Sequence, residues 1–172
     1  LVVNQSLNVN APDYFLATIS RPLADKGYYV FPVNAVKRLL EDDGLSDANL
    51  VHNAPASRLA RLFGADAVLY VSIDRWDARY LVVATQVTVQ LSYTIKDGQT
   101  DEVLWQDRQT ILYQPETANS GNPLVDLAVN AVNAAITKAA PNYLPLARQA
   151  NQQAFNHREI PPGPYALEAA EP

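Results

Sequence analysis

The sequence predicts a single α/β domain built on a five-stranded mixed sheet with flanking helices. Two short apolar strands, at residues 28–31 and 67–71, are separated by two amphipathic helices. A strand–helix–helix–strand crossover of this kind joins parallel strands. In addition, apolar and polar residues alternate with period two over residues 80–95, which predicts a long antiparallel strand with one solvated face.

The N-terminal segment predicts a strand followed by a helix. Residues 1–7 form the strand, and Asn10 and Pro12 are favourable residues for the cap and first turn of the helix. Pro22 lacks a backbone donor, so it is expected to kink or divide this helix. Gly27 is expected to end it in the left-handed conformation, directly before the strand at 28–31.

The crossover consists of two helices and a buried strand. A helix over residues 33–43 stops at Gly44, and a second over residues 55–63 stops at Gly64. The strand at 67–73 is apolar on both faces, which is typical of a central strand between two layers. We therefore expect three parallel strands, connected by right-handed crossovers.

An antiparallel pair of strands is expected to complete the sheet. The strand at 80–95 ends at residues 96–99, which contain the Asp-Gly signal of a hairpin. Residues 103–113 return as the partner strand, and Trp105 is expected to form a cross-strand pair.

The C-terminal part predicts two further helices and a tail. An alanine-rich helix is expected over residues 124–139, and a mostly polar one over residues 144–157. The domain would then span residues 1–160, and the proline-rich residues 161–172 would form a mobile tail or an arm.

Composition excludes several classes of function. The net charge is −5 and the longest basic run is the pair Lys37-Arg38, which argues against binding to nucleic acid. The absence of cysteine excludes thiol catalysis and disulfides within these residues. No apolar run reaches the length of a membrane span, so any membrane attachment is expected outside the chain. Because the chain starts inside an apolar run without a methionine, we also expect residues upstream of Leu1.

One loop offers the residue types of a metal or small-ligand enzyme. Asp42, Asp43, Asp47 and His52 lie close together in sequence, and carboxylates with a histidine can hold a metal ion. Their spacing matches neither a calcium loop nor a catalytic zinc site. A serine triad with its usual nucleophile motif and a glycine-rich phosphate loop are also absent. We therefore expect no catalytic residue, metal or cofactor, and keep an enzyme that uses this loop as the alternative.

Residues 74–80 are the best candidate for a partner surface. They mix charge, arginine and aromatic residues, which dominate the binding energy of protein interfaces. The residues expected to contact a partner are Arg75, Trp76, Arg79 and Tyr80. The equally favoured interpretation is a salt-bridged turn between strands in which Trp76 covers the sheet edge.

The helix at residues 124–139 is the candidate for self-association. Its small residues would allow a close approach of a second helix, and one stripe of it is apolar. The residues of that stripe are Val125, Val129, Val132 and Ile136. The more favoured interpretation is that this stripe packs on the sheet.

Long ungapped blocks of the chain, at residues 11–14, 26–33, 37–48 and 62–67, carry a resemblance to known proteins. They resemble a family of outer-membrane lipoproteins of Gram-negative bacteria whose function is unknown. One neisserial member is a vaccine-candidate surface antigen. The resemblance extends over most of the chain to about residue 140.

The resemblance implies a fold like the N-terminal domain of the translocation protein TolB. It also implies an upstream signal peptide and a lipidated cysteine that anchors the protein at the outer membrane, on the periplasmic side or the cell surface. It supplies no catalytic residues. With the residue patterns, it leads us to expect a non-enzymatic interaction module in envelope transport, secretion or assembly, with an envelope protein partner and possible homodimerisation.

Overall fold

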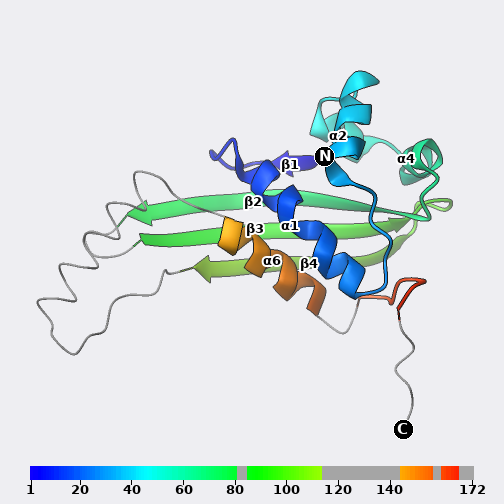
Figure 1. Ribbon diagram of the computed structural model, residues 1–172. Helices are drawn as coiled ribbons and strands as arrows, with labels where there is room; N and C mark the ends of the chain where they lie inside the picture. The colour runs from blue at the N-terminus through cyan, green and yellow to red at the C-terminus, as the bar shows by residue number, and fades with distance from the viewer. Residues whose placement is uncertain (81–84, 114–143, 157–159, 167–172) are drawn as a thin grey trace, which may run out of the picture.

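The computed structural model is an α/β fold in which helices flank a four-stranded mixed sheet (Figure 1). It describes residues 1–80, 85–113, 144–156 and 160–166. The strands follow the spatial order β1 (Val2–Asn4), β2 (Ala67–Tyr80), β3 (Thr85–Asp97) and β4 (Val103–Tyr113). β1 is parallel to β2, whereas β2 with β3 and β3 with β4 are antiparallel. The α/β class and the mixed sheet agree with the prediction, but the expected number of five strands is wrong.

The missing strand is the aromatic segment at residues 28–31. This segment forms no strand and joins no sheet in the described part of the chain. Its aromatic residues pack on one another and on a helix instead: the ring of Phe31 lies 5.5 Å from that of Tyr29 and 6.5 Å from that of Phe63. The sequence pattern assigned this segment to the sheet, whereas side-chain packing stabilises it outside the sheet.

The predicted turn at residues 74–80 is also wrong, because β2 continues through it to Tyr80. The register of β2 against β3 shifts between Ile73 and Arg75, which marks a β-bulge at Asp74. Strict alternation would place Arg75 on the same face as Ile73. The extra residue instead leaves Arg75 exposed and buries Trp76, which is 4% exposed.

The hairpin between β3 and β4 is confirmed. The carboxylate of Asp97 accepts hydrogen bonds from the backbone N–H groups of Gln99 and Thr100, at 2.7 and 2.8 Å. Both bonds lower the pKa of Asp97 below its usual value, and the bond from Thr100 has the larger effect. Trp105 pairs with Ile95 across the strands and is buried.

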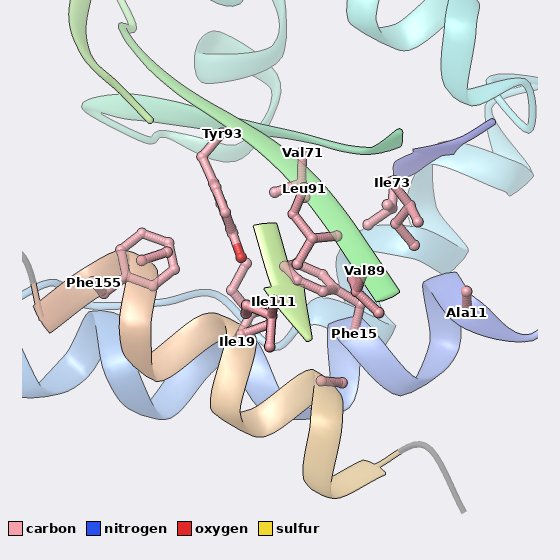
Figure 2. Packing of buried hydrophobic residues seen from close by; sticks show 14 of the residues in the cluster. Ala11, Phe15, Ile19, Val71, Ile73, Val89, Leu91, Tyr93, Ile111 and Phe155 are labelled. Atoms are coloured by element: carbon pink, nitrogen blue, oxygen red, sulfur yellow. The ribbon is translucent and has the colours of Figure 1, made fainter. Parts of the chain in front are cut away.

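The main core lies between the sheet and two helices, α1 (Ala11–Asp25) and α6 (Leu144–Asn156), which lie side by side across one face (Figures 1 and 2). We call this the inner face. α1 runs through Pro22 without being divided, and Pro22 is itself buried. The largest fully buried apolar side chains of this core are Phe15, Ile73, Val89, Leu91, Tyr93, Leu146 and Phe155. Among the described helices, none has the length and apolar character that a bilayer span requires.

A buried polar network joins the two helices to the sheet. The Tyr93 hydroxyl donates to the Asn151 side-chain oxygen at 3.2 Å, and the Asn151 amide donates to the Thr18 hydroxyl at 2.9 Å. The same amide nitrogen contacts the carbonyl of Phe15 at 3.3 Å. Burial raises the pKa of Tyr93 far above its ordinary value, so the phenol stays protonated as this donor. The network fixes α6 against α1 at one relative position.

A second, smaller core lies on the opposite face, which we call the outer face, at the beginning of β2. It is formed by three short helices, α2 (Val33–Asp42), α3 (Ala48–Asn53) and α4 (Ala56–Phe63), which lie at one end of the sheet (Figure 1). Its buried side chains are those of Leu40, Val51, Ala56, Leu59 and Tyr70. Gly64 ends α4 in the left-handed conformation that the sequence predicts, with φ of 66°.

The described part of the proline-rich tail, residues 160–166, packs against the turn that follows α1. We call this segment the C-terminal arm. Gly163 N–H donates to the Lys26 carbonyl, and Tyr165 N–H to the Gly27 carbonyl, each at 2.9 Å. The Tyr28 hydroxyl donates to the Pro161 carbonyl at 2.6 Å. The arm therefore follows the chain backbone closely at the point where α1 ends.

Candidate functional site

The candidate site is the part of the outer face that lies beyond α2, α3 and α4. Strand pairing places a set of mainly polar side chains there: Ser72, Asp74, Arg75, Asp77, Thr88, Gln90, Ser92, Thr94, Gln106, Arg108, Thr110 and Leu112. The members on β4, from Gln106 to Leu112, are all exposed. The inner face, by contrast, is covered by α1 and α6. The described helices pack on the inner face or at the beginning of β2, and they leave this part of the outer face uncovered.

A side-chain network from all three long strands organises the centre of this face. The bulge at Asp74 directs its carboxylate over the sheet, where the Ser92 hydroxyl donates to it at 2.6 Å. The Arg108 guanidinium donates to the same carboxylate at 2.9 Å and to the Ser92 hydroxyl at 3.1 Å. The Asp74 side chain is 14% exposed, whereas that of Arg108 is 65% exposed. The Asp74 carboxylate thus holds the Arg108 guanidinium in place while that cation still faces solvent.

The structure describes the side chains of two of the four residues predicted to contact a partner, Arg75 and Trp76, and places them on opposite faces of the sheet. Arg75 lies on the outer face, exposed, and its guanidinium pairs with Asp77 at 2.5 Å. Trp76 points into the main core, so in this conformation its ring is not available to a partner. Arg79 and Tyr80 lie at the end of β2, where their backbones pair with those of Gln86 and Thr85. Arg75 is therefore the one residue of the four whose described side chain lies on the candidate surface.

Sequence reasoning missed Ser92 and Arg108. Both occupy polar positions in strands along which apolar and polar residues alternate, and that alternation does indicate a solvated face. It does not indicate that Asp74 meets them, because the bulge that brings its carboxylate over the sheet has no clear sequence signal. The predicted self-association stripe, Val125, Val129, Val132 and Ile136, lies outside the described residues and stays a prediction.

The acidic loop does not form a cluster around His52. Asp47 caps α3 by accepting a hydrogen bond from Asn49 N–H at 2.8 Å, while Asp42 and Asp43 are exposed at the end of α2. Within the described residues, nowhere do three or more His, Cys, Asp or Glu side chains gather closely enough to hold a metal ion. The structure therefore offers no geometry that favours the alternative of an enzyme using this loop.

His52 takes part in packing between α3 and the sheet. Its Nε2 lies 3.1 Å from the carbonyl oxygen of Leu1, and its ring meets that of Tyr70 edge to face at 5.1 Å. Burial lowers the pKa of His52 below its usual value, and the hydrogen bond to Leu1 only partly opposes this effect.

We expect His52 to make stability depend on pH in the mildly acidic range. Because its pKa is lower in the folded than in the unfolded chain, its contribution is fully present above the unfolded value and is lost as the pH falls. The free energy of unfolding should therefore fall more steeply between about pH 7.5 and 5.5 in the wild type than in His52→Gln. Urea unfolding at a series of pH values measures this, and parallel pH profiles of the two proteins would contradict it.

Comparisons with known proteins place this architecture in a family. Residues 1–164 match the profile of a family described as "Putative lipoprotein GNA1162-like". A protein of Neisseria meningitidis serogroup B, named "Putative lipoprotein NMB1124/NMB1162", is 29% identical over 168 residues, which are 96% of this chain and 78% of that protein. The crystal structure of lipoprotein GNA1162 from Neisseria meningitidis is 30% identical and superimposes with a TM-score of 0.63, over 80% of this chain and 94% of that one.

These comparisons confirm the resemblance that the sequence blocks indicate. The profile matches nearly the whole chain, and the similar crystal structure shares the α/β arrangement of mixed sheet and helices. The chain therefore belongs to the GNA1162-like family of lipoproteins.

Proposed function

We propose that this chain is the folded domain of a lipid-anchored envelope protein that works as a non-enzymatic interaction module. Membership of a lipoprotein family supports an anchor upstream of Leu1. The proposed location is the outer membrane, facing the periplasm or the cell surface, and the proposed process is envelope transport, secretion or assembly. The proposed partner is a protein of the same compartment.

The observation that carries this proposal is the solvated outer face with its positioned arginines. Arg75 and Arg108 both stand on this face, each paired with an aspartate of β2. Arginine is enriched among the residues that dominate interface energy, and a guanidinium already held in one orientation loses less entropy on binding. The exposed side chain of Leu112 adds an apolar contact at the end of β4, where it is 56% exposed.

Site-specific photo-crosslinking in living cells tests the proposal on the full lipidated protein. A photoreactive residue at Thr110, on the outer face, should form a product with one envelope protein. The same residue at Gln152, which is exposed on α6, should not. Equal crosslinking from both positions, or none from Thr110, would contradict the proposed surface.

A pair of matched charge reversals makes the test specific. Arg75→Glu disrupts an exposed ion pair on the outer face, and Lys37→Glu disrupts an exposed ion pair with Asp13 elsewhere. Exposed ion pairs contribute about 0–1 kcal/mol, so both variants should fold. We expect Arg75→Glu to reduce the Thr110 crosslink at least about fivefold, because an interface arginine often contributes more than about 1 kcal/mol. Lys37→Glu should leave it unchanged.

A further inference from the structure

A cavity lies between the start of β2 and the three short helices that cover it. Its volume is about 170 Å³, and it is partly open to solvent. Protein interiors are close-packed, and voids much larger than a water molecule are few. The small core formed by α2, α3 and α4 therefore leaves a space that its own side chains do not fill.

The described side chains of the cavity wall are mostly apolar, and none of them is an acid, a lysine or an arginine. Aliphatic side chains such as those of Val36, Leu40 and Val68 form much of this wall. The two polar side chains are already engaged within the protein: His52 Nε2 lies 3.1 Å from the Leu1 carbonyl, and the Tyr70 hydroxyl donates to the Ala54 carbonyl at 3.4 Å. A molecule in this cavity would therefore find few free hydrogen-bonding groups, and a polar or charged ligand would lose its hydration without compensation.

Aromatic rings line two sides of the space. Phe63 contacts Phe31 on one side, with ring centroids 6.5 Å apart. Tyr70 meets His52 edge to face on another, at 5.1 Å. Aromatic side chains favour offset and edge-to-face contacts with a further ring.

We propose that this cavity is a binding site for one small, uncharged aromatic molecule of about the size of a benzene ring. A dry engineered cavity of about 150 Å³ with a comparable aliphatic and aromatic lining binds benzene. The volume of about 170 Å³ fits the same ligand with little space left over. The site lies under α2, α3 and α4 and is separate from the solvated part of the outer face, so it does not depend on the proposed partner surface.

Thermal unfolding of the purified domain with benzene as the probe tests the proposal. A ligand that binds only the folded state raises the unfolding temperature, and the rise grows with the logarithm of its concentration once that exceeds the Kd. Benzene should raise it in the wild type, whereas benzoate at the same concentration should not, because its carboxylate would lose its hydration among side chains that carry no charge. n-Hexane should raise the unfolding temperature less than benzene does at the same concentration. No effect of benzene, or an equal effect of benzoate or n-hexane, would overturn the proposal.

Two variants with the same chemical change localise the site. Val68→Phe places a ring in the cavity and should abolish the benzene shift, whereas Val103→Phe, at a half-exposed position on β4, should leave it intact. If Val68→Phe does not fold, methyl NMR of the wild type decides the question. Benzene should then shift the methyl signals of Val36, Leu40 and Val68 while leaving those of Leu112 unchanged. Equal shifts at Leu112, or a benzene shift retained in Val68→Phe, would overturn the assignment.

Discussion

Replacing Phe155 with alanine is expected to lower the free energy of unfolding by about 3–5 kcal/mol, the range for truncating a buried aromatic residue. Phe155 is fully buried in α6 and contacts two rings of the sheet. Its ring centroid lies 5.3 Å from that of Tyr93, edge to face, and 5.6 Å from that of Trp105. Truncation removes both ring contacts and leaves a cavity between the helix and β3 and β4 that the surrounding side chains cannot fully close.

Chemical denaturation followed by circular dichroism measures the change. Gln152→Ala is the matched control, because Gln152 lies on the same helix and is exposed, so its truncation should change stability by less than about 0.5 kcal/mol. A loss below about 1.5 kcal/mol for Phe155→Ala would mean that α6 does not contribute the buried ring that the structure assigns to it.

Replacing Gly27 with alanine should destabilise the fold more than the same change at Gly44. Both glycines have left-handed backbones, with φ of 83° and 79°, so each substitution carries a cost of about 1–2 kcal/mol from the conformation alone. A Cβ at Gly44 would meet nothing within 4 Å. A Cβ at Gly27 would lie 2.0 Å from the backbone nitrogen of Ala166, so the C-terminal arm must move.

Moving the arm breaks the hydrogen bonds of Gly163 to Lys26 and of Tyr165 to Gly27. At about 0.5–1.5 kcal/mol for each bond, Gly27→Ala should cost roughly 1–3 kcal/mol more than Gly44→Ala. Chemical denaturation gives the difference in stability. Hydrogen exchange should show faster exchange of the Gly163 and Tyr165 amides in Gly27→Ala alone. Equal stability losses, with unchanged protection of both amides, would show that the arm does not depend on the space at Gly27.

The local elements of the fold were largely predictable, because each depends on a short-range pattern. The alternation that produces β3, the hairpin at Asp97 and the stop at Gly64 all agree with the structure. The extent of β2 was not predictable. Its charged residues after Ile73 resemble a turn, and only the bulge at Asp74 explains how the strand can continue with Trp76 facing inward.

Other features depend on contacts between distant segments, which no local pattern contains. Residues 28–31 have the composition of a strand, but ring packing against Phe63 stabilises them outside the sheet. The outer-face network joins Asp74, Ser92 and Arg108, which come from three different strands. The sequence shows that each of these positions is polar, but it does not show that they meet. Family membership was predictable, since the resemblance rests on long blocks that the comparisons then matched.

The contact between α1 and α6 has a consequence for the time course of folding. The Asn151 amide reaches the Thr18 hydroxyl across 133 positions of the chain, so α1 cannot complete its native packing until α6 has been synthesised. Contacts of such high sequence separation slow folding, because a long loop must close before they form. Until residues 144–156 emerge, α1 can pack on the sheet, but the side of it that contacts α6 has no native cover and is exposed to aggregation or to chaperones. The topology therefore delays completion of the main core until residues 144–156 have left the ribosome.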